Sequence, residues 1–223
     1  MSKLYKLTTQ DNKTRKGCYN ECVWGEGVSH SGTGEGDLCG PGFIHAYDNP
    51  YLAVLLNPIH AEVSYPKIWE AEGDVVKNDR GLKVGCITLT TIKIIPLPII
   101  SNTQKVAFGI LCAKEVYKES IWTTWADNWL NNVDRSARSA HSAAHSAYSA
   151  YSARSAAYSA AYSAFYSAAD RADNAYSARS AAYSAAYSAY SDANSAYSDA
   201  NSAYSDANSA LDFEKIISLM QSF

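Results

Sequence analysis

The sequence predicts an α+β head domain in residues 1–130, followed by a long α-helix rich in Ala, Ser and Tyr. Two observations support this prediction. In the head, short segments rich in β-branched and aromatic residues alternate with segments whose apolar residues have helical spacing. From Arg135 to Ala210 the chain has no Gly or Pro and consists mainly of Ser, Ala and Tyr. We therefore expect three parts: the head (1–130), a helical repeat segment (131–210) and an amphipathic C-terminal helix (211–223).

The head contains several strand and helix candidates. Its composition predicts strands at 4–9, 42–47, 68–76 and 90–97, with a weaker candidate at 83–88. The pair Asn49-Pro50 predicts the start of a short helix over 50–56, because Pro is favoured in the first helical turn. Apolar residues at helical spacing predict a further helix over 103–118.

Three tryptophans follow at the end of the head. Trp122, Trp125 and Trp129 are spaced so that they form one apolar stripe on a helix, which favours a place in the core over a ligand platform. We expect them to attach the long helix to the head. If that helix ran straight from Trp125 to Ser222, its length would be on the order of 145 Å.

The repeat segment has a measurable period. A Ser followed by Ala recurs at a mean spacing of about 3.5 residues between Ser136 and Ser209. A spacing near 3.5 keeps one stripe facing a partner when helices wind left-handedly around each other, so the segment is predicted to be coiled-coil-like. Residues 151–164 recur unchanged as 176–189, which is typical of a spacer that grew by duplication. The Tyr stripe lapses around 168–174, so a bend or hairpin there is an alternative to one straight helix.

The last repeats predict a self-association seam. Tyr190, Tyr197 and Tyr204 lie seven residues apart on one helical face, with Ala193 and Ala200 close by. Small Ala side chains let helices approach closely, while Tyr adds ring area and keeps its hydroxyl at the edge. A seam of Ala alone, with Tyr outside, is the alternative.

The C-terminal segment holds the strongest apolar cluster after the head. We expect an amphipathic helix that either packs on its own chain or acts as an oligomerisation clasp. The residues concerned are Leu211, Phe213, Ile216, Ile217, Leu219, Met220 and Phe223.

Composition limits the class of protein. The formal net charge is −3 and no basic patch recurs, so nucleic acid is not an expected partner. The first residues lack the apolar stretch of a signal peptide, and no apolar run approaches membrane-spanning length. Five cysteines in such a chain indicate reduced thiols in a cytoplasm.

Four of the polar residues near the N-terminus could hold a metal. Cys18, Cys22, His30 and Cys39 are zinc-ligand types, but their spacing is loose and scattered thiols are the alternative. The expectation is therefore no metal, with this site as the weaker alternative. Cys86 and Cys112 lie among apolar neighbours and are expected in the core.

Two motifs carry a resemblance to a known family. The segment from Cys39 to His45 contains Cys-x-x-Gly-Phe, with a His one place later than usual, and Glu70-Ala71-Glu72-Gly73 forms a Glu-x-x-Gly strand. Residues 5–97 resemble a family of small uncharacterised domains from bacteriophages and prophages. The resemblance implies a phage origin, a place in the cytoplasm of a bacterial host or in the virion, frequent low-complexity tails and no known activity.

The chain also has a more distant likeness to ADP-ribosyltransferase-like folds. That likeness implies NAD as cofactor, with His30 or His45 holding the ribose, Tyr47 stacking on nicotinamide, and Glu70 or Glu72 orienting the acceptor. The alternative for Glu70 and Glu72 is a solvent-facing pair, because strand alternation places both on one face of a half-buried strand. The alternative for His45 is a partly buried histidine whose hydrogen bonds are satisfied.

Three classes of function follow. A structural or interaction protein, in which the repeat segment self-associates into a homo-oligomer and displays the head, explains the most residues. A transferase-type enzyme explains only the His and Glu residues. A regular helical face that binds ice or an ordered polymer is the third class.

Overall fold

The computed structural model describes residues 2–79, 81–116, 118–148 and 212–223. The chain divides into two compact units, Met1–Ile99 and Ile100–Phe223, which we call the sheet unit and the helical unit. The boundary between them lies inside the range 1–130 that we expected to form one head. The predicted seam of Tyr190, Tyr197 and Tyr204, together with Leu211, lies outside the described residues.

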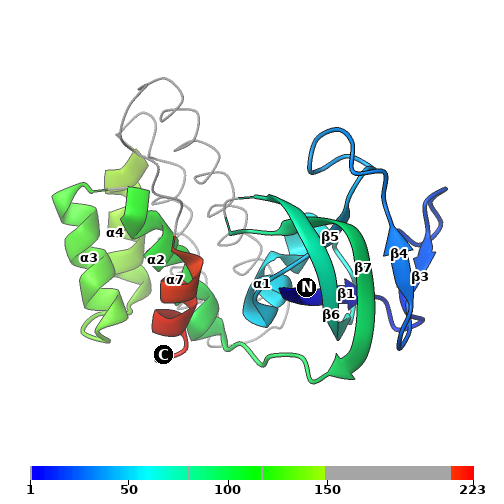
Figure 1. Ribbon diagram of the computed structural model, residues 1–223. Coiled ribbons are helices and arrows are strands. Elements are labelled where there is room, and N and C mark those ends of the chain that lie inside the picture. Colours follow the sequence, from blue (N-terminus) through cyan, green and yellow to red (C-terminus); the bar gives the residue numbers. More distant parts are fainter. Residues whose placement is uncertain (1, 80, 117, 149–211) are drawn as a thin grey trace. The chain divides into compact units, whose positions relative to one another are not determined.

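The sheet unit confirms an α+β fold with an antiparallel sheet (Figure 1). Its elements are β1 (Ser2–Thr8), β2 (Lys13–Thr14), β3 (Cys22–Val23), β4 (Ser29–Ser31), β5 (Ile44–Ala46), α1 (Pro50–His60), β6 (Lys67–Asn78) and β7 (Val84–Ile95). The strand candidates at 83–88 and 90–97 belong to the single strand β7. Strands β2, β3 and β4 were not predicted, because they are only two or three residues long and β2 and β4 are polar.

The sheet curls until its ends meet. Its strand order is β1-β6-β7-β4, and β5 pairs with β7 beside β4. Tyr47, just after β5, bridges back to Tyr5 on β1 with two backbone hydrogen bonds of 2.7 and 3.0 Å. The long strands β6 and β7 are strongly curved (Figure 1), and their pairing shifts register near Glu70 and near Val75. Such bulges increase bending and allow a small sheet to close.

The inner face of the sheet forms a core of its own. Alternation places Leu4 of β1 opposite Ala71 of β6, and both are buried with Leu89 and Cys86 of β7. The predicted faces of β6 are confirmed, since Glu70 lies on the other side, opposite Tyr5. Side chains at alternate positions of a strand point to opposite faces, so one side of β6 is apolar and the other is partly polar.

Helix α1 follows β5 directly. The side chain of Asn49 accepts a hydrogen bond of 2.9 Å from the backbone N–H of Tyr51, and Pro50 occupies the first turn. This is the favoured start of a helix, because the cap satisfies a free N–H and Pro has none to lose. Leu52 and Leu56 are buried, so α1 contributes a second set of apolar side chains to the sheet unit.

The loop before β5 is held by its backbone. The N–H of Gly34 donates to the carbonyl of Gly42 over 2.8 Å, and the N–H of Gly32 donates to Ile87 of β7 over 2.8 Å. A side chain at Gly42 would bring its Cβ to 2.0 Å from the carbonyl oxygen of Glu35. Glycine is therefore required there by the close approach of two backbone segments.

The helical unit contains four described helices: α2 (Asn102–Val116), α3 (Ser120–Leu130), α4 (Ala137–Tyr148) and α7 (Phe213–Met220). Trp122, Trp125 and Trp129 of α3 are all buried, so their predicted place in the core is confirmed. The carboxylate of Glu119 caps α3 by accepting from the backbone N–H groups of Ile121 and Trp122.

The helix that contains Trp125 does not continue into the repeat segment. Helix α3 ends at Leu130, and Asn132 adopts a φ of 59°, the left-handed conformation that terminates helices. The guanidinium of Arg135 lies 4.5 Å from the centre of the Trp129 ring, and its Nε donates to the Trp129 carbonyl over 2.8 Å. Helix α4 then starts at Ala137 and packs on α3.

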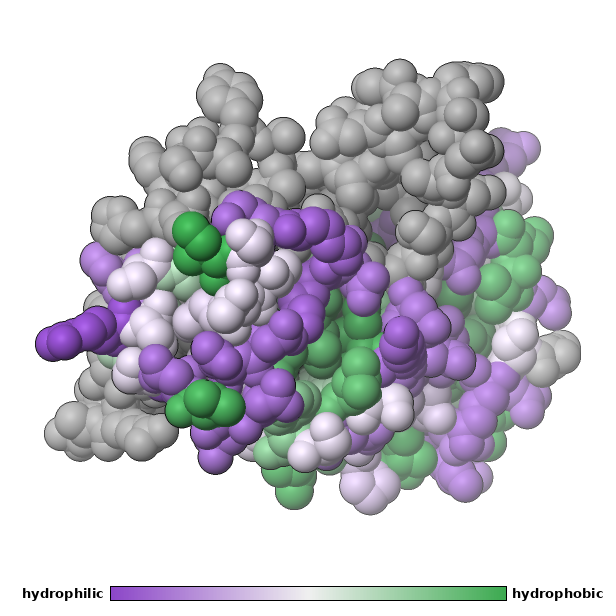
Figure 2. All heavy atoms as spheres, turned by 90° about the vertical axis from the view of Figure 1, so that its left-hand side faces the viewer, coloured by the Kyte–Doolittle hydropathy of each residue, from purple (hydrophilic) through white to green (hydrophobic). Residues whose placement is uncertain are grey.

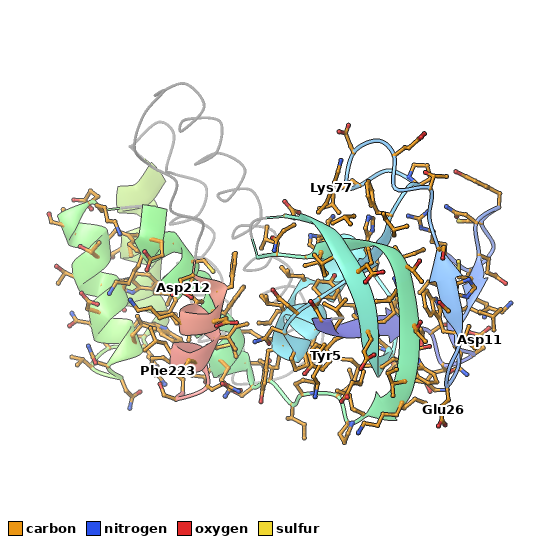
Figure 3. The ribbon with its side chains drawn as sticks, in the orientation of Figure 1. Tyr5, Asp11, Glu26, Lys77, Asp212 and Phe223 are labelled. Carbon is orange, nitrogen blue, oxygen red and sulfur yellow. The ribbon has the colours of Figure 1, made fainter. Side chains whose placement is uncertain are left out.

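Helix α7 packs on its own chain. Asp212 caps it by accepting from the backbone N–H of Lys215 over 3.0 Å. The side chains on one face are buried, namely those of Phe213, Ile216, Ile217 and Met220. The Phe213 ring stacks 6.4 Å from that of Phe108 in α2, and Figure 3 marks Asp212 and Phe223 at the two ends of the C-terminal segment.

Exposed apolar side chains are few in the helical unit. Hydrophobic and hydrophilic residues are interspersed on the face shown in Figure 2. Among the described residues of this unit, the exposed large apolar side chains are those of Ile121, Val133 and Leu219. No helix in the described ranges is both long enough and apolar enough to cross a membrane.

Candidate functional site

The residues expected under the enzyme hypothesis lie on or beside the curled sheet. Tyr47, Tyr5 and Glu70 form one row that runs from the residue after β5 across β1 to β6, because Tyr5 pairs with both of the others. Only 6% of Tyr47 is exposed, and its hydroxyl lies 3.1 Å from Nδ1 of His60 in α1. The two rings are stacked at 6.0 Å, and burial raises the pKa of Tyr47 above its usual range. The Tyr47 ring is thus covered by its own chain, where the enzyme hypothesis needs it open to nicotinamide.

The two glutamates face outward. The carboxylate of Glu70 forms an ion pair of 3.1 Å with Lys3 on the neighbouring strand, and hydrogen bonding to Glu70 raises the pKa of Lys3. Glu72, two residues further along β6, is exposed. The alternative of a solvent-facing pair on a half-buried strand therefore describes their positions.

His45 has a structural hydrogen bond. Its Nε2 is hydrogen-bonded to the carbonyl of Leu38 in the preceding loop. This contact fits a partly buried histidine with a satisfied hydrogen bond, which was the alternative to a role in binding ribose. Burial lowers its pKa, and the charges of Lys6, Lys83 and Arg15 lower it further. Burial likewise lowers the pKa of His60 to about 4, so both histidines are neutral at pH 7.

A buried lysine lies close to this histidine. Lys83, immediately before β7, has a side chain that is only 8% exposed. Its Nζ lies 3.2 Å from Sγ of Cys39 and 4.0 Å from the carboxylate of Asp79. In addition to burial, the charge of Lys83 lowers the pKa of both His45 and His60.

The proposed zinc ligands are not brought together. His30 on β4 is bonded through Nε2 to the carbonyl of Val23 at 2.8 Å, and its ring contacts Trp24 edge-on at 4.5 Å. The thiol of Cys22 lies 3.6 Å from the carbonyl of Asn20. In the ranges that the structure describes, no group of three or more His, Cys, Asp or Glu residues could hold a metal ion.

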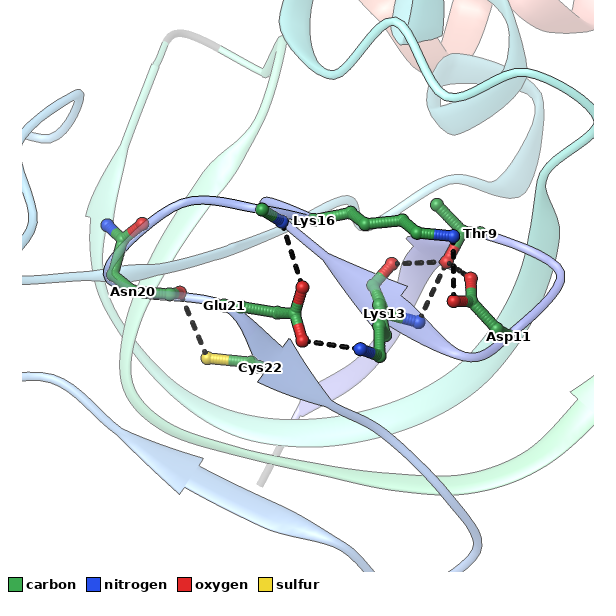
Figure 4. Close-up of polar contacts among 8 residues, drawn as sticks. Thr9, Asp11, Lys13, Lys16, Asn20, Glu21 and Cys22 are labelled. Atoms are coloured by element: carbon green, nitrogen blue, oxygen red, sulfur yellow. Dashed lines mark hydrogen bonds and ion pairs between the residues drawn. The ribbon is translucent and has the colours of Figure 1, made fainter.

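The loop between β1 and β3 is stabilised by a network of polar contacts (Figure 4). Asp11 accepts a hydrogen bond of 2.6 Å from the hydroxyl of Thr9 and pairs with Lys16 at 2.9 Å, and these bonds lower its pKa to about 2. Glu21 pairs with Lys13 at 2.6 Å and accepts from the backbone N–H of Gly17 at 2.9 Å. Both acids of this network are therefore occupied by lysines of the same loop.

Lys6 is the polar residue that the sequence reasoning missed. It lies on the inner face of β1 between Leu4 and Thr8, and its Nζ donates to the backbone carbonyl of His45 over 2.6 Å. The ammonium also lies 5.3 Å from the centre of the Trp24 ring. Burial lowers the pKa of Lys6 to about 8. The alternation of apolar residues along β1 was the signal that could have revealed a lysine on the core face.

Comparisons with known proteins add no relative. No protein-family model matches the chain, no curated protein is similar to it, and no solved structure matches its fold. The resemblances to the phage domains and to ADP-ribosyltransferase-like folds therefore stay predictions.

Proposed function

We propose that this chain is a structural or interaction protein whose repeat segment forms paired helices, self-associates into a homo-oligomer and displays the sheet unit. One observation supports it above the others. Helices α4 and α7, which lie before and after residues 149–211, both pack within the helical unit, α4 on α3 and α7 on α2.

The two packing sites are joined to each other. Helix α2 contacts α3, so α4 and α7 rest on one helical base. The ring stack of Phe108 with Phe213 holds the start of α7. At its other end, the ring of Phe223 lies 5.9 Å from the guanidinium of Arg135, at the turn from which α4 leaves. A chain that departs at α4 and returns at α7 has to double back between them.

This requirement favours the hairpin over the straight stalk. We propose that residues 168–174 form the turn, where the Tyr stripe lapses. The two copies of the duplicated block, 151–164 and 176–189, then lie at nearly equal distances on either side of the turn. In an antiparallel pair of helices the copies would lie side by side, so that the same Ala spacing faces itself and the Tyr stripe lies outside.

Self-association then uses the outer stripes of the hairpin. The buried face of α7 is occupied by its own chain, which leaves the Tyr stripe of the repeat and the exposed Leu219 for contact between copies. Tyr rings can supply that contact because each combines a large apolar face with a polar edge.

A distance measurement tests the hairpin. Spin-labelled amino acids are placed at Ala150 and Ala210, and labelled chains are diluted into an excess of unlabelled chains. A hairpin predicts a separation below about 30 Å, whereas one straight helix predicts about 90 Å. A dominant long distance would refute the hairpin. Light scattering tests the oligomer, and a strict monomer at every concentration up to the millimolar range would refute self-association.

Paired deletions provide a matched control. Removing both 151–164 and 176–189 shortens each arm by the same 14 residues, or about 21 Å, and keeps the period of about 3.5. Removing only one copy leaves the arms unequal by that length. We expect the double deletion to retain the helix content per residue and the thermal midpoint better than either single deletion. The opposite order would contradict the paired-arm arrangement.

A further inference from the structure

The inner face of the sheet carries a lysine that has no acidic partner. The ammonium of Lys6 contacts the carbonyl of His45 and the indole of Trp24, as described above. The other titratable groups that influence it are Arg15, Cys22 and Cys86. In the part of the chain that the structure describes, no carboxylate forms an ion pair with Lys6. Removing an ammonium from water is costly, and proteins usually offset this cost with a counter-charge.

The charge of a second cation, Arg15, acts on Lys6. Arg15 directly follows Thr14 of β2, whose hydroxyl accepts a hydrogen bond of 2.9 Å from Nε1 of Trp24, the ring that lies under Lys6. The charge of Arg15 opposes protonation of both Lys6 and His45. The Arg15 side chain is exposed, and it forms no ion pair with the other described residues. The nearby acids Asp11 and Glu21 are paired with Lys16 and Lys13 instead.

The backbone of Arg15 has a left-handed conformation. Its φ is 53°, in the left-handed region that a residue with a Cβ adopts at some cost. Strain of this kind persists where the surrounding structure holds the residue in place. Here the β2–β3 pairing of Thr14 with Cys22 and the hydrogen bond of Cys18 N–H to the Arg15 carbonyl, at 2.9 Å, hold it.

We propose that Lys6 and Arg15 together bind a small tetrahedral oxyanion, such as a free phosphate or the phosphate group of a monoester. An ammonium supplies a point charge and a guanidinium supplies paired N–H donors, and both are common in phosphate sites. The anion gives the half-buried ammonium the counter-charge that the chain itself does not provide. The site belongs to the sheet unit and does not depend on the repeat segment.

Binding is coupled to the protonation of Lys6. The anion favours the charged amine, so affinity falls as pH rises through about 8, the pKa of Lys6 in the absence of ligand. Over this range His45 is already neutral, because burial lowers its pKa. Cys86, whose pKa is raised to about 11 by burial, also keeps its proton.

The test uses sulfate as the first probe, because it has the same shape and does not titrate over this range. Calorimetry of the full chain at constant ionic strength measures sulfate binding at pH 7.0 and pH 9.5. We expect saturable binding that weakens by about 30-fold between these pH values, as follows from a free pKa of about 8. Inorganic phosphate and O-phosphoserine, measured at pH 7.0, distinguish a free anion from a monoester group.

Three variants locate the site. Lys6→Met and Arg15→Asn should each weaken sulfate binding by at least 10-fold, and Asn tolerates the left-handed backbone at position 15. Lys3→Met removes a lysine from the outer face of the same strand and should leave binding unchanged. Because Arg15 is exposed, its variant keeps the test valid if Lys6→Met does not fold. Absence of saturable binding, equal losses in all three variants, or affinity independent of pH would each overturn the proposal.

Discussion

Replacement of Phe213 by Ala should destabilise the helical unit strongly. Phe213 is 4% exposed and stacks on Phe108 of α2, so truncation removes most of a buried ring and leaves a cavity beside α2. Buried Phe to Ala changes cost about 3 to 5 kcal/mol. We expect about 3 kcal/mol, the lower end, because α7 has only eight residues and can relax into part of the space.

The assay compares two positions of one helix. Leu219 lies outside the buried face of α7 and is 44% exposed, so Leu219→Ala removes a smaller apolar group from a site that is partly in water. Its expected cost is below about 1 kcal/mol. Urea unfolding followed by tryptophan fluorescence measures both, because Trp122, Trp125 and Trp129 all lie in the helical unit.

Measurements at low and high protein concentration distinguish packing of α7 on its own chain from packing on a second copy. If α7 packs on its own chain, the loss caused by Phe213→Ala is the same at low and high protein concentration. A loss that changes with concentration would mean that α7 docks on a second copy and would refute the hairpin argument built on its position. Equal effects of the two substitutions would refute the assigned burial.

Three further predictions concern titration and backbone conformation. The pKa of Lys6 is lowered to about 8 in the folded state, so the unfolded chain binds more protons than the folded chain above pH 8. Between pH 8 and 10.5 the free energy of unfolding should therefore rise by about 2 to 3 kcal/mol relative to that of Lys6→Met. His60, with its pKa lowered to about 4, should titrate near pH 4 by NMR, and stability should fall by about 2 to 3 kcal/mol relative to His60→Gln as pH drops from 6.5 to 4; an ordinary midpoint near 6.5 would contradict its burial. Asn132→Gly should be nearly neutral in thermal unfolding, whereas Asn132→Val should cost about 1 to 2 kcal/mol, since φ is 59° there; equal midpoints would contradict the left-handed turn.

Strands could be predicted from the sequence where the side chains on the two faces of a strand differ in polarity. Along β6, Ile68, Glu70 and Glu72 share a face because the side chains of a strand alternate, and the structure confirms this. The boundary between the candidates at 83–88 and 90–97 had no physical basis, since Leu89 continues the apolar inner face without a breaker. Short polar strands such as β4 are set by their partner β7, and a single sequence holds no signal for that pairing.

The end of α3 was predictable and was missed. Asn131 and Asn132 follow the last tryptophan, and Asn is among the few residues that terminate a helix in the left-handed conformation. The strong helical pattern on both sides hid this short stop. The return of α7 to α2 was not predictable, because an amphipathic face specifies that it needs a partner and not which partner.

The candidate site shows the same limit. Sequence reasoning selected His45, Tyr47, Glu70 and Glu72 by residue type, but their roles depend on closure of the sheet, which buries Tyr47 against His60 and pairs Glu70 with Lys3. Such contacts join residues that are far apart in the chain. Lys6 was overlooked because a lysine among apolar neighbours is normally assigned to the solvent side.

The pairing of β1 with β6 affects how the protein is made. Strand β1 is synthesised before its partner residues, which run from Lys67 to Gly73, so it leaves the ribosome long before it can be paired. At about 5 to 20 residues per second, this wait lasts several seconds. During that time Leu4 and Leu7 are exposed on an unpaired strand, which is a hazard for aggregation. The lysines at positions 3 and 6 place charge on both faces of the nascent strand and so protect it until β6 arrives.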